Sequence, residues 1–145
     1  MGSRRHPRHL ARRLDRLVHD RARTLDLRKR FEAGLKRIVP DVVVHGAAAP
    51  RLPNTVNASF PGARADHLLL ALDSRGLAAS AGAACASGAV EPSPVLTAMG
   101  VPRELAVCAI RFSLGRTTTA DDVTRALAIV DESVQAARQA TRVAT

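Results

Sequence analysis

Near its C-terminal third the chain reads Val107-Cys108-Ala109-Ile110-Arg111-Phe112-Ser113-Leu114. Successive side chains of a β-strand point to opposite faces of the sheet. If this segment is a strand, Ile110, Phe112 and Leu114 share one apolar face, and Ala109, Arg111 and Ser113 share the other. The pattern therefore predicts a strand that packs its Phe112 side into a core and holds Arg111 on the opposite side.

The flanking sequence predicts short strands and helices around this strand. Further strands are expected over residues 42–44, 55–60 and 77–80, and helices over 66–74, 93–99 and 102–106. Thr119 is expected to cap a final helix that runs to about Arg138, with Asp121 and Asp122 in its first turn. Its apolar stripe consists of Val123, Leu127, Val130 and Val134. This order predicts an α+β fold, in which helices cover one side of a small antiparallel sheet.

The N-terminal segment is strongly basic. Residues 1–30 carry a net charge of +8, out of +9 for the whole chain of 145 residues. We expect residues 1–8 to form a disordered basic tail and residues 9–39 to form a long helix, ended by Pro40. Residues 9–145 then make one small domain. The charge is compatible with nucleic-acid binding, but the segment has no aromatic residue to stack on bases, so a solvated helix face is the preferred interpretation.

Composition also bears on the compartment. The chain has two cysteines, Cys85 and Cys108, without a CxxC pair or a histidine cluster, so neither a zinc site nor a disulfide framework is expected. Unpaired thiols suit a reducing cytoplasm. No apolar run approaches the roughly 20 residues that a membrane span requires, and no signal peptide is visible. A cytoplasmic protein without a metal or a membrane contact is predicted.

Cys85 lies in an unusual environment. The twelve residues from Ala78 to Ala89 carry no side chain larger than that of Cys85, and Gly82 and Gly88 lie on either side of the thiol. Such a run cannot pack a core of its own. It is either a flexible linker that happens to hold a cysteine, or a mobile arm that carries a sulfur nucleophile.

Four groups of residues, in this order, resemble the C-terminal part of the cysteine desulfurases of the class V aminotransferase family, in the group with a long cysteine loop. They are Leu52 to Phe60, Ser80-x-Gly82-x-Ala84-Cys85-x-Ser87-Gly88 with Glu91-Pro92-Ser93, Ala98-Met99-Gly100, and Ile110 to Arg116. The resemblance covers residues 51–138 clearly. It implies the small C-terminal domain of a fold-type I pyridoxal-phosphate enzyme, preceded by a connecting helix.

The resemblance also implies roles for two residues. Cys85 corresponds to the thiol that receives sulfur from L-cysteine as a persulfide, leaving alanine, and Arg111 to the guanidinium that binds the carboxylate of the substrate. The sequence departs from the family at Ala81, Ala83 and Ala86, where hydroxyl side chains are usual. By the same resemblance the sulfur is destined for iron–sulfur cluster or thio-cofactor assembly, and the expected partners are a sulfur acceptor or iron–sulfur scaffold protein and a second copy in a homodimer.

The residues that would hold pyridoxal phosphate are not evident in this chain. The cofactor forms a Schiff base with a lysine, and the two lysines, Lys29 and Lys36, both lie in the predicted N-terminal helix. No glycine-rich phosphate cradle precedes a helix either. We therefore expect the chain to be inactive alone, or to be one half of a split enzyme whose large domain is a separate polypeptide. A stand-alone persulfide carrier and a non-catalytic fragment with a nucleic-acid-binding helix are the alternatives.

Other polar residues receive structural predictions. Arg116 is expected to form an ion pair, and Asn54 and Asn57 to form turn or loop hydrogen bonds to the backbone. Cys108 is expected to be a small buried apolar residue. The sequence suggests no role for His45 or His67.

Overall fold

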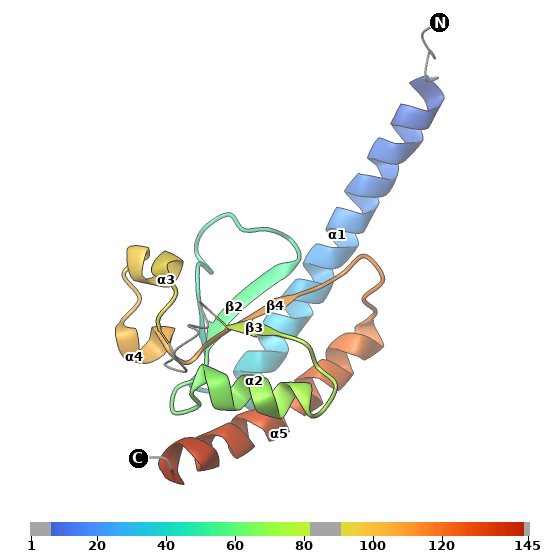
Figure 1. Ribbon diagram of the computed structural model, residues 1–145. Coiled ribbons are helices and arrows are strands. Elements are labelled where there is room, and N and C mark those ends of the chain that lie inside the picture. Colours follow the sequence, from blue (N-terminus) through green and yellow to red (C-terminus); the bar gives the residue numbers. More distant parts are fainter. Residues whose placement is uncertain (1–6, 82–90, 144–145) are drawn as a thin grey trace, which may run out of the picture.

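The computed structural model describes residues 7–81 and 91–143, with side chains from Leu17 onward. The chain begins with the long helix α1 (Pro7–Ile38), whose first half extends well beyond the rest of the molecule (Figure 1). Residues 7 and 8, expected in the disordered tail, are helical, because a proline is well accommodated in the first turn of a helix. Leu17 and Val18 in the extended half are exposed.

A four-stranded antiparallel sheet forms the centre of the fold. Its spatial order is β1 (Val43–Val44), β2 (Thr55–Ser59), β4 (Ala109–Ser113) and β3 (Ser80–Ala81). Strand β4 therefore lies between β2 and β3, and its register aligns Arg111 with Asn57 on one side and with Ser80 on the other. The small antiparallel α+β fold predicted from the sequence is confirmed.

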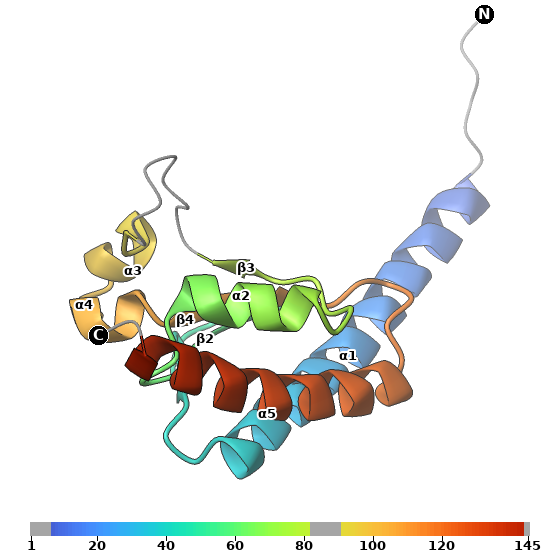
Figure 2. The ribbon, with the colours of Figure 1, turned by 60° about the horizontal axis from the view of Figure 1, so that its bottom comes forward.

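Three helices cover one face of the sheet. Helix α2 (Ala65–Asp73) packs beside α5 (Ala120–Val143), and α5 packs against α1 (Figure 2). The alternating residues of β4 place Ile110 and Phe112 in the core beneath these helices. The ring of Phe112 meets the edges of Phe31 and Phe60, with ring centroids 5.1 and 6.3 Å apart. These are the three phenylalanines of the chain, and they all lie in one cluster.

Two short helices, α3 (Pro94–Ala98) and α4 (Arg103–Ala106), lie at one end of the sheet (Figure 1). Leu96 and Ala106 form a second, smaller apolar cluster with Ala109. Ala109 points away from the main core, so this cluster covers the opposite face of the sheet at that end. Arg111, two residues further along β4, is exposed.

Helix α5 begins with a reciprocal capping arrangement. The hydroxyl of Thr119 accepts a hydrogen bond from the Asp122 backbone N–H at 3.1 Å, and the Asp122 carboxylate accepts one from the Thr119 backbone N–H at 2.9 Å. This is a capping box, as the position of Thr119 predicted. The hydrogen bonds to Thr119 hold the pKa of Asp122 at about 2. The helix extends five residues past the expected end at Arg138, because no glycine or proline follows to stop it.

Strand β3 is shorter than predicted and begins later, at Ser80 instead of Leu77. The antiparallel register would continue by placing Leu77 opposite Leu114, but a cavity of about 160 Å³ separates Leu77 and Ala78 from the end of β4. Leu77 instead packs against the core directly after the turn at Gly76, whose φ is +80°. The sequence could not reveal this separation, because alanine-rich segments fit a strand or a loop equally well.

Candidate functional site

Arg111 occupies the centre of the open face of the sheet. It is exposed, and it makes no hydrogen bond or ion pair with any residue that the structure describes. Its neighbours Ile110 and Phe112 are buried in the core, so the backbone from which it projects is fixed by packing on the opposite face. The arrangement presents a free guanidinium on a rigid support, which is what bidentate recognition of a carboxylate requires.

Asn57 and Ser80 flank Arg111 on the neighbouring strands. Asn57 is its partner on β2 and Ser80 its partner on β3. Directly opposed residues of an antiparallel pair share a face, with Cβ atoms about 4.5–5.5 Å apart. These three residues, which we call the polar row, therefore cross the sheet side by side. Neither neighbour of Arg111 is acidic, so the row leaves the positive charge available for an anionic ligand.

Cys85 lies outside the described residues, between Ala81 at the end of β3 and Glu91. The residues on either side of this segment are nevertheless held in place. Ser80, the residue before Ala81, belongs to the polar row, and Glu91 forms an ion pair with Arg103 of α4 at 3.4 Å. The segment that contains the predicted nucleophile therefore departs from the strand adjacent to Arg111.

A buried pair, His45 and Ser59, fastens the end of the sheet beside the polar row. The Ser59 hydroxyl donates to the Leu105 carbonyl at 2.7 Å, and His45 Nε2 lies 2.6 Å from the same hydroxyl. The His45 backbone N–H donates to the carbonyl of Asn57 at 2.9 Å. With the Ser59 proton used on Leu105, the consistent tautomer has His45 donating from Nε2. This pair could not be predicted from the sequence, since the two residues are fourteen positions apart and no spacing pattern links them.

Burial lowers the pKa of His45 below its ordinary value of 6.5. As the pH falls below about 6.5, the histidine is protonated in the unfolded chain before it is protonated in the folded chain. The stability that the neutral ring contributes is therefore complete above about pH 6.5 and declines as the pH falls. We predict that the His45→Gln variant loses less unfolding free energy between pH 7.5 and 5 than the wild-type chain does. Urea unfolding at both pH values measures this, and His19→Gln, at an exposed histidine, is the control. Equal losses in His45→Gln and wild type would contradict the prediction.

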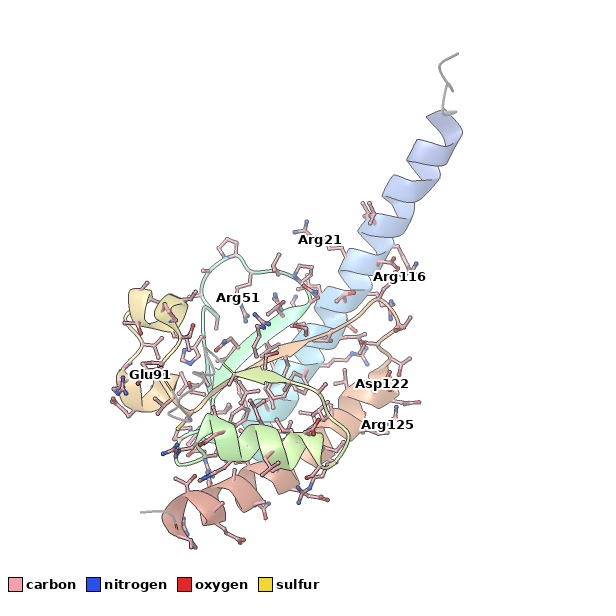
Figure 3. All side chains as sticks on the ribbon, in the orientation of Figure 1. Arg21, Arg51, Glu91, Arg116, Asp122 and Arg125 are labelled. Atoms are coloured by element: carbon pink, nitrogen blue, oxygen red, sulfur yellow. The ribbon has the colours of Figure 1, made fainter. Side chains whose placement is uncertain are left out.

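A largely buried ion network ties α1 to the loop that enters β2. Arg51 donates to both carboxylate oxygens of Glu32, at 2.8 and 3.2 Å, and Arg28 Nε lies 3.5 Å from the same carboxylate. Arg28 also donates to the Leu52 carbonyl at 2.6 Å. Arg51 is a residue of this loop (Figure 3). The spacing of Arg28 and Glu32, one helical turn apart, is a signal from which this pair could have been predicted, whereas the third member comes from a distant segment.

Two expectations about polar side chains are corrected. Arg116 makes no ion pair with the described residues; it lies beside α1 (Figure 3), and its backbone carbonyl accepts a hydrogen bond from Arg23. Asn57 lies within β2, as predicted, but its side-chain oxygen is buried and accepts no hydrogen bond from a described residue, so the expected side-chain bond to the backbone is not made. The backbone carbonyl of Asn54, not its side chain, accepts a hydrogen bond from the Leu114 N–H at 2.8 Å.

Cys108 is buried, as predicted. Burial raises the pKa of its thiol, so at neutral pH it stays protonated and is a poor nucleophile. This leaves Cys85 as the better candidate for sulfur chemistry.

The residues do not fit pyridoxal phosphate. Lys29 and Lys36, the lysines of the chain, are both exposed on α1, and neither lines the cavity beside the end of β4 or the hollow beside Arg138. In the same part of the chain, no cluster of His, Cys, Asp or Glu is arranged to hold a metal ion. None of the described helices is apolar over a stretch long enough to cross a membrane.

Comparison with known proteins gives consistent matches. The family described as Aminotransferase class-V matches residues 15–126. The cysteine desulfurase IscS of Methanosarcina thermophila is 46% identical over 114 residues, and the cysteine desulfurase NifS of Azotobacter vinelandii is 40% identical over 111 residues; these regions are 79% and 77% of the present chain. The chain spans only 28% of the length of either relative. An X-ray structure of a NifS-like protein from Rickettsia africae superposes with a TM-score of 0.74 at 30% identity, covering 86% of this chain and 32% of the other.

Proposed function

Because the chain belongs to the Aminotransferase class-V family, we propose that it acts as the small C-terminal part of a cysteine desulfurase. In this proposal Arg111 binds the carboxylate of L-cysteine, and Cys85 takes up its sulfur as a persulfide, leaving alanine. The persulfide sulfur then passes to an acceptor for iron–sulfur cluster or thio-cofactor assembly.

The observation that carries the proposal is the position of Arg111. An arginine at the centre of a sheet face, without a partner among the residues that the structure describes, is available for an anionic ligand, and β3 beside it leads within a few residues to Cys85. A chain extends at most about 3.6 Å per residue, so the Cα of Cys85 cannot be farther than about 18 Å from that of Ser80. A thiol within this radius can meet a small amino acid held at Arg111.

The described residues determine which part of the reaction this chain can carry out. In the transfer, an S–S bond forms between the Cys85 thiolate and the cysteine sulfur, the C–S bond breaks, and its electron pair stays with the carbon, which takes up a proton. The family to which the chain belongs implies that pyridoxal phosphate makes this C–S bond cleavage possible, but the described residues do not fit that cofactor. We therefore propose that the activity requires the part of the family's length that this chain does not span.

Reconstitution tests this proposal. The chain is mixed with L-cysteine, pyridoxal phosphate and a second polypeptide that comprises the part of the Methanosarcina thermophila IscS outside the aligned region. We expect alanine to form and one sulfur atom to appear on Cys85 by mass spectrometry. The Cys85→Ser variant should reduce alanine formation by about two orders of magnitude or more, because the nucleophile is lost.

Cys108 provides an internal control, because a Cys108→Ser variant should keep its sulfur uptake. Alanine formation that is equally fast with and without the present chain would refute the proposal. If sulfur reaches Cys85 only from an intact desulfurase, and no alanine forms in the reconstituted mixture, the chain is a persulfide carrier instead.

A further inference from the structure

The side-chain oxygen of Asn57 is an unexplained feature of the polar row. It is buried and has no hydrogen-bond partner among residues 7–81 and 91–143. Leaving such an acceptor unsatisfied costs about 1–3 kcal/mol, so a buried orphan oxygen calls for an occasional partner. The backbone of Asn57 does not share this problem, since its carbonyl accepts from the His45 N–H at 2.9 Å.

The residue directly opposite Asn57 is Arg111, whose hydrogen-bond donors are not used by the described residues. Arg111 carries five N–H donors on a planar group, and none of them is used by a described residue. Asn57 and Arg111 are register partners on the same face of β2 and β4. An orphan acceptor and a set of free donors thus face each other across one strand spacing, within reach of the long arginine side chain.

From this juxtaposition we propose that Asn57 is a positioning residue for Arg111, resting on the proposed function of Arg111 as a carboxylate clamp. When a carboxylate binds, the guanidinium turns toward Asn57 and donates one N–H to the Asn57 side-chain oxygen. Its remaining edge then presents two parallel N–H groups to the carboxylate. A neutral amide suits this role, because it orients the guanidinium without neutralising it, whereas an aspartate would compete with the ligand.

The ligand arm of the test uses nuclear magnetic resonance of the 145-residue chain, following the Nε–Hε signal of Arg111, identified by its absence in Arg111→Lys. L-alanine, the proposed product, should shift this signal with saturation, and ethylamine, which lacks the carboxylate, should not. Asn57→Ala should weaken L-alanine binding about tenfold, the usual scale for a hydrogen bond to a charged group. Thr55→Val, on the same face of the same strand, is the matched control and should bind as the wild type does.

A second arm tests the contact without any ligand. In Asn57→Asp, the introduced carboxyl should have a lower pKa than the same carboxyl in the double variant that also carries Arg111→Gln, because burial raises both pKa values and the guanidinium lowers only the first. A merely structural role of position 57 would give equal pKa values in the two variants. The same Asn57→Asp variant should no longer bind L-alanine at neutral pH.

The outcomes separate the two proposals. Equal carboxyl pKa values in Asn57→Asp and in the double variant with Arg111→Gln, or unchanged L-alanine binding in Asn57→Ala, would overturn the positioning role while leaving the clamp in place. A wild-type chain that never responds to L-alanine, together with a lowered pKa that depends on Arg111, would support the Asn57–Arg111 contact and refute the carboxylate clamp of the proposed function.

Discussion

Replacing Phe112 with alanine is expected to lower the free energy of unfolding by about 3–5 kcal/mol, the range for large-to-small changes at buried aromatic positions. Phe112 is the middle ring of the aromatic cluster, so the substitution removes both of its edge contacts, to Phe31 and to Phe60. Such contacts contribute beyond the area that they bury. No other aromatic residue is present to fill the space.

The existing cavity places this cost near the upper end of the range. Phe112 lines the cavity of about 160 Å³ between residues 77–78 and β4. Removing the ring would join the vacated space to this cavity, and the cost of a core truncation increases with the volume of the residual cavity. The surroundings cannot easily collapse, because Phe31 and Val123 on the cavity wall belong to the long helices α1 and α5.

Urea unfolding followed by circular dichroism measures the effect. Phe112→Leu keeps most of the apolar volume and should cost less than half as much as Phe112→Ala. Leu70→Ala, at a side chain that is 72% exposed, should change the stability by less than about 0.5 kcal/mol. A Phe112→Ala variant that loses less than 1.5 kcal/mol would show that the aromatic cluster is not the centre of the core.

The Glu32→Gln variant is expected to lose about 3–5 kcal/mol, for an electrostatic reason. Glu32 is the shared counter-ion of Arg28 and Arg51, and the three side chains are only 15%, 9% and 16% exposed. Glutamine has nearly the same shape, so packing is conserved and only the charge is lost. Two cations would then remain in a poorly hydrated position without an anion, which is far more costly than the loss of an exposed pair.

A matched pair on the same helix gives the control. Asp26 and Arg30 also lie four residues apart, at 2.8 Å, but their side chains are 58% and 62% exposed. Asp26→Asn should therefore cost no more than about 1 kcal/mol. Both variants replace a carboxylate by the corresponding amide in an ion pair of α1, and they differ in how deeply that pair is buried. Equal losses for Glu32→Gln and Asp26→Asn would contradict a role for burial and refute the prediction.

The local features of the fold follow from the sequence because their causes are local. The alternation around Arg111 predicts which side chains of β4 face the core, and Thr119 with Asp122 predicts the start of α5. The resemblance to the class V aminotransferases adds the architecture and the expected sulfur chemistry. The roles of Cys85 and Arg111 are predictions that the reconstitution and binding experiments address.

The features that the sequence could not predict depend on segments distant along the chain. Arg51 joins Arg28 and Glu32 only because the loop before β2 crosses α1. Ser59 meets His45 and the Leu105 carbonyl only because β1, β2 and α4 converge. The juxtaposition of Asn57 and Arg111 has a similar cause, since only the pairing of β2 with β4 brings these two residues opposite each other.

The position of Arg111 on the inner strand has a further consequence for how the molecule fluctuates. At Arg111, β4 is paired on both edges and its neighbours Ile110 and Phe112 are buried in the core, so this part of the strand leaves the sheet only when the core opens. The amides of Ile110 and Phe112 should exchange with deuterium as slowly as the most protected groups of the molecule. Fraying at the ends of the chain does not reach this part of the strand. Destabilising variants should therefore reduce the fraction of molecules that hold this guanidinium in place, without distorting it in the molecules that stay folded.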